Sequence, residues 1–217
     1  MASLFIWALL FSPPHGAVSA QVTFPVHGPT TVTADTSIGV PPALSVVNTA
    51  GALLLRAEYT LGAELTAEQR RGSPVPDTMR FQVVDTPEVG PLVVAVAGEL
   101  GGSDSSFETA LVGEVGGSLR DLLPDHPRTS NQDAVCLGHF GRGLRLGVVE
   151  ATFVWGERES HYAPHIYDIA LYLWSGHGFE LFSRQRTTHR HKSSRSALVE
   201  LGFHCRYDFV RALLPEL

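Results

Sequence analysis

Four histidines are the residues of this sequence whose type and spacing could bind a metal. His161 and His165 lie four residues apart, and His189 and His191 lie two residues apart. A spacing of four places two imidazoles on one face of a helix, and a spacing of two places them on one face of a strand, as a Zn²⁺ site would need. Pro164 disfavours a helix around the first pair, and cations flank the second pair. We therefore predict no metal and no cofactor, and these histidines are the alternative.

Hydrolytic chemistry would need a serine, a histidine and a carboxylate. The pairs Ser103-Asp104 and Ser160-His161 could supply a nucleophile, and Glu157 or Asp168 could orient the base. The sequence has no Gly-x-Ser-x-Gly motif, which presents the nucleophile in many serine hydrolases. We predict a binding or interaction protein without catalytic activity, and the alternative is a secreted metal-dependent or serine-type hydrolase.

Aromatic residues beside polar turns indicate a binding surface. Exposed rings stack on sugars and anchor protein interfaces. Period-two alternation along residues 167–174 places Tyr167 and three aliphatic residues on one face of a strand, and the polar and aromatic residues on the other. We predict that the second face is the contact surface, and the open alternative is that these rings fill the core. The predicted ligand-contacting residues are Trp174, Tyr172, Asp168, Trp155 and Tyr162.

The charge of the chain limits the partners of such a surface. A formal net charge of −6 at pH 7 argues against a general nucleic-acid binder, which usually carries a basic domain. The basic residues nevertheless gather in one run, with no acid between Leu181 and Val199, which is either a solvated loop or a contact for an anionic surface. We predict a protein or glycan ligand and no nucleic acid. The run contains Arg184, Arg186, His189, Arg190, His191, Lys192 and Arg195.

The first 20 residues predict export. An uncharged apolar run over residues 4–11 is followed by Ser12-Pro13-Pro14 and then by small residues up to Ala20, as in a cleavable secretory signal. The run is shorter than the roughly 20 residues that cross a bilayer. We predict a signal peptide over residues 1–20, cleavage before Gln21, a secreted or periplasmic location, and no stable membrane insertion after cleavage. A buried N-terminal strand or helix is the open alternative.

Cys136 and Cys205 are the only cysteines of the chain. An even pair in an oxidising compartment predicts a disulfide. The bond would close a loop of about 70 residues, and such bridges commonly stabilise a fold by about 2–4 kcal/mol. Two separate buried thiols are the alternative.

The mature chain, residues 21–217, is predicted to form a single β-rich domain. Its first part, residues 21–79, combines strands and helices, beginning with short strands interrupted by prolines. Apolar spacings of three and four over residues 44–59 favour a helix, while Gly51 and the β-branched residues leave a strand open. Residues 65–71 have the pattern of a short helix that ends at a glycine and two prolines.

The C-terminal part, residues 192–217, is predicted to be helical. Apolar residues with helical spacing indicate helices over residues 193–201 and 207–214. Gly202 is placed to end the first of them.

Residues 80–191 have the pattern of strands and contain an approximate internal repeat. Sliding the chain against itself by about 60 residues aligns residues 93–129 with residues 151–187. Each copy shows a strand, a polar loop, a second strand, a glycine-containing turn and a third strand, which is an antiparallel meander. We therefore predict a mainly β (α+β) fold, with an antiparallel β-meander of two blade-like repeats and covering helices on the N- and C-terminal sides.

Two glycine-rich stretches within this region carry a family resemblance. The stretch Cys136–Val149, CLGHFGRGLRLGVV, and the later YLWSGHGF resemble degenerate FG-GAP/VCBS-type β-propeller repeats, over about residues 90–190. That family has acidic calcium ligands where this chain has His139, Gly141 and Arg142, so the resemblance implies the backbone shape without the calcium site. Two blades are fewer than the roughly four of a closed propeller. We expect an open twisted sheet, and association into a homo-oligomer is the alternative.

Overall fold

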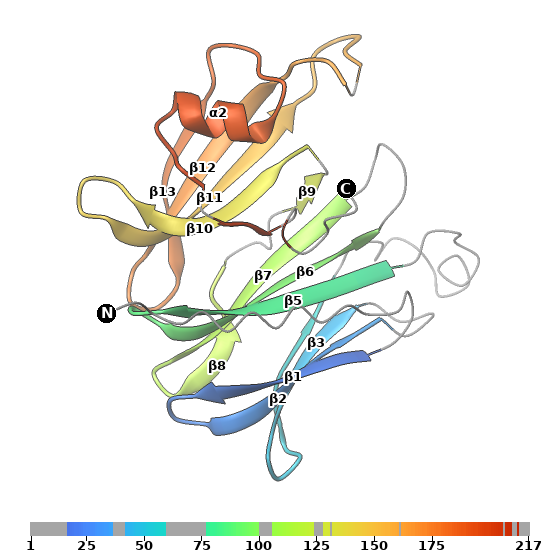
Figure 1. Ribbon diagram of the computed structural model, residues 1–217, viewed down its shortest axis with the longest axis vertical. Coiled ribbons are helices and arrows are strands. Elements are labelled where there is room, and N and C mark those ends of the chain that lie inside the picture. The colour runs from blue at the N-terminus through green and yellow to red at the C-terminus, as the bar shows by residue number, and fades with distance from the viewer. Residues whose placement is uncertain are drawn as a thin grey trace. The chain divides into compact units, whose positions relative to one another are not determined.

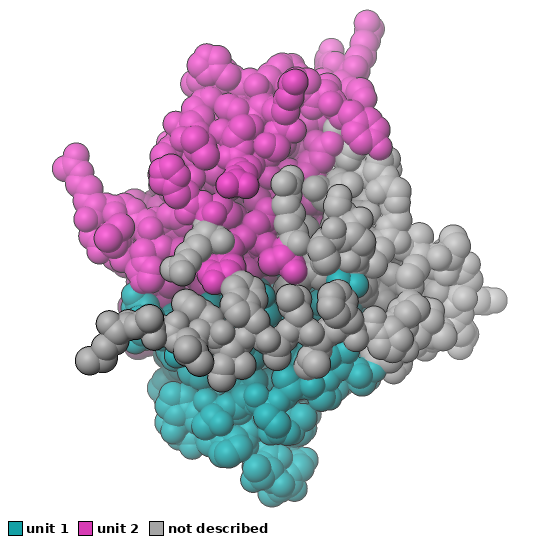
Figure 2. Space-filling view, viewed as in Figure 1, with its two compact units in different colours: residues 1–100, 110–122 teal, residues 101–109, 123–217 magenta. Residues whose placement is uncertain are grey.

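The computed structural model of the protein describes residues 17–36, 42–59, 77–99, 106–123, 128–130, 132–160, 162–205, 207–209 and 212. These residues form mainly β-structure in antiparallel sheets, which confirms the predicted fold class at this level (Figure 1). The chain divides into two compact units (Figure 2). Unit 1 is Met1–Leu100 with Ala110–Leu122, and unit 2 is Gly101–Thr109 with Leu123–Leu217. The predicted helix over residues 65–71 lies outside the described residues.

Unit 1 begins with a four-stranded sheet in which every strand pairs with its neighbour in sequence. Its strands are rich in Val, Thr and Ala, which suit a half-buried pleated surface. The hairpin between the first two strands closes at Gly28, whose φ of 68° is a conformation that glycine adopts readily. The strands are β1 (Ala17–Phe24), β2 (Gly28–Asp35), β3 (Ala43–Asn48) and β4 (Leu53–Glu58).

The second sheet of the chain also follows the sequence order. Its four consecutive strands are joined on one side by a short strand, β9 (Arg128–Ser130), which pairs with the beginning of the third of them. The four strands are β5 (Asp77–Thr86), β6 (Gly90–Glu99), β7 (Ser106–Val115) and β8 (Ser118–Asp121).

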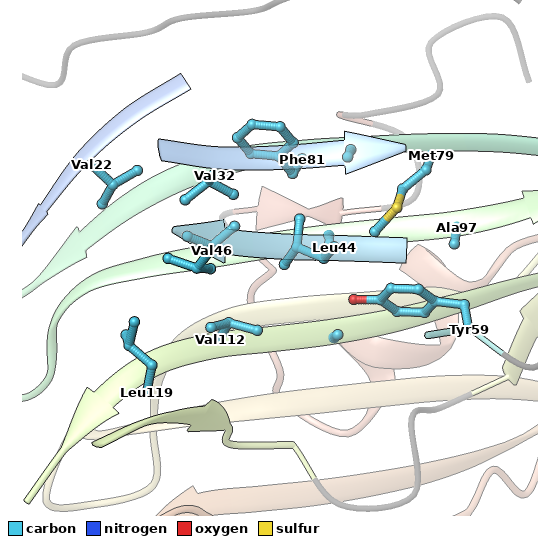
Figure 3. Close-up of a cluster of buried hydrophobic side chains, with 14 of the residues drawn as sticks. Val22, Val32, Leu44, Val46, Tyr59, Met79, Phe81, Ala97, Val112 and Leu119 are labelled. Carbon is cyan, nitrogen blue, oxygen red and sulfur yellow. The ribbon is translucent and has the colours of Figure 1, made fainter. Parts of the chain in front are cut away.

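The core of unit 1 lies between these two sheets. Alternate residues point inward, so Val22 and Phe24 of β1 meet the side chains that β5 and β6 contribute from the other sheet (Figure 3). Such packing of two sheets face to face is a β-sandwich. The buried members include Val32, Leu44, Val46, Met79, Phe81, Val93, Ala95, Val112 and Leu119.

Unit 2 is built on a five-stranded sheet with one helix on it. The sheet order is β13-β12-β11-β10-β14, and the strands are β10 (Ala134–Phe140), β11 (Arg145–Val154), β12 (Ile166–Trp174), β13 (Phe179–Arg186) and β14 (Tyr207–Asp208). The predicted inward face of β12 is confirmed, because Tyr167, Ile169, Leu171 and Leu173 all belong to the core of this unit.

Helix α2 (Ser194–Glu200) lies where the sequence predicted the first C-terminal helix. Ser193 is the N-cap and accepts a hydrogen bond from the Ser196 N–H, and Gly202 follows the helix with a φ of 78°. Ala197 and Leu198 pack into the core of unit 2.

The chain beyond α2 returns to β10, where Cys205 forms a disulfide with the buried Cys136. The two Cα atoms are 5.6 Å apart, and the predicted disulfide is confirmed. None of the described helices is long and apolar enough to cross a membrane.

The helix favoured for residues 44–59 is wrong, since this segment is the β3–β4 hairpin. Asn48 explains the reversal: its side-chain oxygen accepts hydrogen bonds from the Ala50 and Ala52 N–H groups, and Gly51 has a φ of 80°. These contacts close a turn in the middle of the apolar pattern. The covering helix expected on the N-terminal side is therefore absent from this segment.

The helix predicted over residues 207–214 is wrong at its start, where Tyr207 and Asp208 form β14 and pair with Leu137 and Cys136. The disulfide explains this, because it holds the preceding Cys205 beside β10. Most of residues 209–214 lie outside the described residues.

The two predicted repeat copies coincide with β6-β7-β8 and β11-β12-β13, which are antiparallel and follow the sequence order in both cases. The first sheet, β1 to β4, has the same arrangement. The structure thus contains three runs of four consecutive antiparallel strands, where the sequence indicated two shorter ones. That these runs are blade-like repeats of one family stays a prediction.

The structure also describes the residues before the predicted cleavage point. Ala17 to Ala20 form the first half of β1 and pair with β2, from Ala17 opposite Asp35 to Ala20 opposite Val32. Residues 1–16 lie outside the described residues. The signal peptide stays a prediction.

We predict that Gly147→Ala destabilises the protein. A Cβ atom at Gly147 would lie 2.7 Å from the Tyr172 carbonyl oxygen and 2.9 Å from a Leu173 methyl carbon, and the backbone of β12 cannot move without breaking its ladder. We expect a loss of about 1–3 kcal/mol in the free energy of unfolding, measured by urea denaturation. Gly143→Ala is the control, since its Cβ would meet nothing closer than 3.9 Å. Equal losses in the two variants would contradict the prediction.

Candidate functional site

The loop between β11 and β12, residues 155–165, is the candidate site and is called the aromatic loop below. It exposes two large rings: Trp155 is 53% exposed and Tyr162 is 85% exposed. Both were predicted ligand-contacting residues. Of the loop, His161 lies outside the described residues.

Glu159 fixes the conformation of this loop from inside. One carboxylate oxygen accepts hydrogen bonds from the Gly156 N–H at 2.9 Å and from His165 Nδ1 at 2.9 Å. The other oxygen forms an ion pair with Arg190. Only 9% of the Glu159 side chain is exposed, so these three donors replace the water that a carboxylate would otherwise bind.

His165 connects the loop to the segment before α2. Its side chain is fully buried, and its backbone exchanges two hydrogen bonds with His191, at 2.9 Å and 2.7 Å. Arg190 adds a hydrogen bond to the Pro164 carbonyl oxygen at 3.3 Å. The residue just before β12 in the sequence is thereby joined to the segment that follows β13.

The His165 ring supports the exposed rings of the site. It lies 4.8 Å from the Phe153 ring and 5.6 Å from the Trp155 ring, between ring centroids, and Phe153 lies 5.1 Å from Trp155. The two contacts of Trp155 are edge-to-face, at 70° between ring planes, and the Phe153–His165 pair is tilted at 42°; such separations are favourable for aromatic pairs. Trp155 therefore contacts a buried histidine while about half of it meets solvent.

A second carboxylate, Glu200 of α2, contacts the other two candidate histidines, His189 and His191. Its Oε2 atom lies 2.7 Å from His191 Nε2 and 3.5 Å from His189 Nδ1. Loss of hydration is the largest single effect on Glu200 and raises its pKa, but the His191 hydrogen bond, a backbone hydrogen bond from Thr188 and the charges of His191 and His189 together outweigh it, so the pKa of this carboxyl is lowered. The histidines thus face acidic partners, as cationic or hydrogen-bonding groups do.

The four histidines of the alternative metal site are only partly covered by the structure. His165 and His191 are neighbours through their backbones, but their side chains contact different carboxylates. Among the described residues, no group of three or more His, Cys, Asp or Glu side chains could hold a metal. His161 is outside that set, so the four-histidine alternative stays untested.

The predicted hydrolase residues are likewise incompletely described. Ser103, Asp104 and His161 lie outside the described residues. Asp168, one of the proposed carboxylates, accepts two hydrogen bonds from Arg186, at 2.6 Å and 2.7 Å, and this contact lowers the Asp168 pKa.

Two of the remaining predicted ligand-contacting residues, Trp174 and Tyr172, do not form one surface with the aromatic loop. Trp174 ends β12, whereas Trp155 lies beside its beginning, and eight steps of extended strand separate these ends by roughly 26 Å. Tyr172 is only 8% exposed. Trp174 packs against Phe179 at 5.4 Å between ring centroids. Trp155 and Tyr162 are therefore the two predicted residues that this structure presents most openly.

Sequence reasoning missed Glu159 and Arg190 as partners. Glu159 was read only as one polar residue of a loop, because nothing in the sequence shows that a loop carboxylate is buried. The sequence carries no signal for it either, because the sharp turn around Gly156 and Arg158 depends on Arg158 at a φ of 62°, which is unusual for a non-glycine residue. Such a turn folds the Glu159 side chain back onto the Gly156 N–H.

Asp133 holds the neighbouring end of β11. It is buried at the start of β10, and it accepts hydrogen bonds from the Phe153 N–H at 2.8 Å and the Ser130 N–H at 2.6 Å. Burial raises the pKa of Asp133 from 3.8 to about 6, although these hydrogen bonds and the Ser130 side chain oppose the rise. The side chain thus titrates in a range where exposed aspartates are fully ionised.

Comparison with known proteins finds no matching family model, no matching curated protein and no matching solved structure.

We predict that Glu159→Gln loosens the aromatic loop. The amide oxygen can keep the Gly156 and His165 hydrogen bonds only by turning its own NH₂ group toward Arg190, so the ion pair is lost and two donor groups face each other. We expect a loss of about 2–3 kcal/mol in the free energy of unfolding and faster hydrogen exchange at the Gly156 amide. Glu157→Gln is the control, because Glu157 is exposed in the same loop. If both variants behave alike, Glu159 does not hold the loop.

We predict that Asp133 makes the protein less stable as pH rises from about 4 to about 6. In that window the unfolded chain has released the Asp133 proton while the folded chain retains it, so the unfolded state binds fewer protons and the free energy of unfolding falls with pH. The pKa difference corresponds to about 3 kcal/mol.

The measurement is urea denaturation across this pH range in the wild-type protein and in Asp133→Asn. The variant has no titrating group at this position, so its stability should fall less steeply with rising pH. The comparison cancels the contributions of Glu150 and of the histidines, which are present in both proteins. Parallel pH curves would contradict the raised pKa.

Proposed function

We propose that this chain is an exported binding protein that contacts a protein or glycan ligand through Trp155 and Tyr162 of the aromatic loop. The observation that carries the proposal is the exposure of these two rings, 53% and 85%, on a loop whose base is buried and hydrogen-bonded. Rings held in this way offer a large contact area at a small cost in conformational entropy.

The fixed base distinguishes this loop from other exposed apolar positions. Glu159 and His165 hold the backbone from inside, and the His165–His191 pairing ties the loop to the chain before α2. A ligand would therefore meet rings whose orientation is largely set before binding. Arg190, which is about half exposed beside them, could contact a polar or anionic part of the ligand.

Export is part of this proposal. The predicted signal over residues 1–20 supports it, and so does the Cys136–Cys205 disulfide, since such bonds persist in secreted and periplasmic compartments. The resemblance to FG-GAP/VCBS-type repeats is a further part. The antiparallel order of β10 to β13 supports it, while His139 and Arg142 still occupy positions where that family has calcium ligands.

The test is a screen of the purified exported protein against glycan arrays and displayed protein libraries, followed by affinity measurements on variants. We predict that Trp155→Ala and Tyr162→Ala each weaken binding of the selected ligand by about tenfold or more, because each removes an exposed ring that anchors the contact.

Two control variants separate this site from other exposed apolar residues. Leu144→Ala removes an exposed side chain at the opposite end of β11, and Trp174→Ala removes the ring at the far end of β12. Both should bind the ligand with the affinity of the wild-type protein. A ligand whose affinity changes in Trp174→Ala but in neither loop variant would move the site to the other end of the sheet.

A further inference from the structure

Strand β13 lies at the edge of the unit 2 sheet (Figure 1). Among the described strands it pairs with β12 alone. An edge strand presents one row of backbone N–H and C=O groups that can pair with an added strand. Proteins often protect such edges with prolines, charged side chains or bulges. Strand β13, with the sequence FELFSRQR, contains no proline, and its bulge and its charges define which partner strand the edge could accept.

The side chains of β13 are exposed to an unusual degree for a strand of a folded domain. Six of its eight residues are exposed, and only Phe179 is buried. Leu181 is 53% exposed and Phe182 is 65% exposed. Two adjacent large apolar side chains in solvent indicate a contact surface more than isolated exposed residues do.

A bulge defines which part of the edge is regular. Leu171 pairs with Ser183 and Tyr172 pairs with Leu181, so Phe182 has no opposite residue on β12. Beyond the bulge, Ser183 to Arg186 pair with β12 without interruption. The regular edge therefore consists of these four residues, with the two apolar side chains immediately before them.

The positive charge of this edge favours an acidic partner strand. Arg184 and Arg186 alternate along the regular part, and the sequence contains no acid between Leu181 and Val199. Arg186 forms an ion pair with Asp168, whereas Arg184 is exposed and interacts with the carboxylates of Glu150 and Asp168 through its charge. A second copy of β13 added in antiparallel orientation about Arg184, Gln185 or Arg186 would bring arginines opposite one another, which is unfavourable. An acidic strand would instead place carboxylates opposite Arg184.

We propose that β13 is a docking edge for an extended, acidic segment of a partner protein, which adds as a strand beside Ser183–Arg186 and covers Leu181 and Phe182. The recognition is β-strand addition: backbone hydrogen bonds give affinity, and the alternation of charge gives specificity. The proposed edge uses other residues than Trp155 and Tyr162, so variants of the two sites test the two proposals independently.

The test uses a fluorescein-labelled peptide, Glu-Val-Glu-Phe-Glu-Val-Glu, titrated with the full exported protein and followed by fluorescence anisotropy. A peptide with Lys in place of each Glu should bind at least tenfold more weakly. A peptide with N-methyl groups on alternate amides should also bind at least tenfold more weakly, because its methylated amides cannot donate hydrogen bonds to the carbonyl groups of the edge strand. Hydrogen exchange should slow at the backbone amides of Ser183–Arg186 when the acidic peptide is bound.

Variants locate the binding. Arg184→Glu and Phe182→Ser should each lower the affinity for the acidic peptide by at least tenfold. Arg142→Glu, an equal charge change at an exposed turn, should leave this affinity unchanged. Thermal unfolding of each variant checks that it is folded. Because Arg184 is exposed and lies outside the bulge at Phe182, Arg184→Glu tests the binding without changing the bulge.

Three outcomes would overturn the proposal. The first is no binding of the acidic peptide, and the second is equal weakening by Arg184→Glu and Arg142→Glu, which would indicate unspecific charge attraction. The third is binding of heparin, lost in Arg184→Glu, without any binding of the peptide, which would identify an anionic polysaccharide as the ligand of this edge.

Discussion

The buried contact between Glu159 and His165 is the interaction on which the candidate site depends. A carboxylate with 9% exposure is stable only if its lone pairs are satisfied, and here the turn at Gly156, the beginning of β12 and the segment before α2 each supply one donor. Three separate parts of the chain are thereby fixed to one side chain. The exposure of Trp155 follows from this arrangement, because the His165 ring beneath it already occupies the interior.

The rest of the fold combines local hairpins with contacts between residues far apart in sequence. In all three sheets, strands that follow one another in sequence pair side by side, and hairpins with short connections, such as β7–β8 and β12–β13, close at a small entropic cost. In unit 2 the long-range contacts include the pairing of Cys136 with Asp208 and the Cys136–Cys205 disulfide, which spans 69 positions and, in the chain-entropy account, stabilises a fold by about 4 kcal/mol. That bond and β14 hold the C-terminal segment on β10.

The sequence predicts the antiparallel strands well because alternation is a local property. It correctly indicates that Tyr167, Ile169, Leu171 and Leu173 face the core. It fails over residues 44–59, where apolar residues on both sides of the Asn48 turn mimic helical spacing. It also cannot rank the aromatic residues: Tyr172 and Tyr162 differ tenfold in exposure, because the neighbours that cover Tyr172 are set by the tertiary fold. For the same reason the sequence does not indicate the ion pair between Glu159 and Arg190, which lie 31 positions apart.

The predicted signal and strand β1 make competing demands on Ala17 to Ala20, and the burial pattern of β1 shows how both can be met. The two fully buried residues of the strand, Val22 and Phe24, lie after the predicted cleavage point, while Val18 and Ala20 are only partly buried. A chain that begins at Gln21 keeps the ladder from Gln21 opposite Thr31 to Phe24 opposite Gly28. The side chains that anchor β1 in the sandwich would therefore remain after such a cleavage, because small residues suited to a signal peptidase contribute little apolar area to a core.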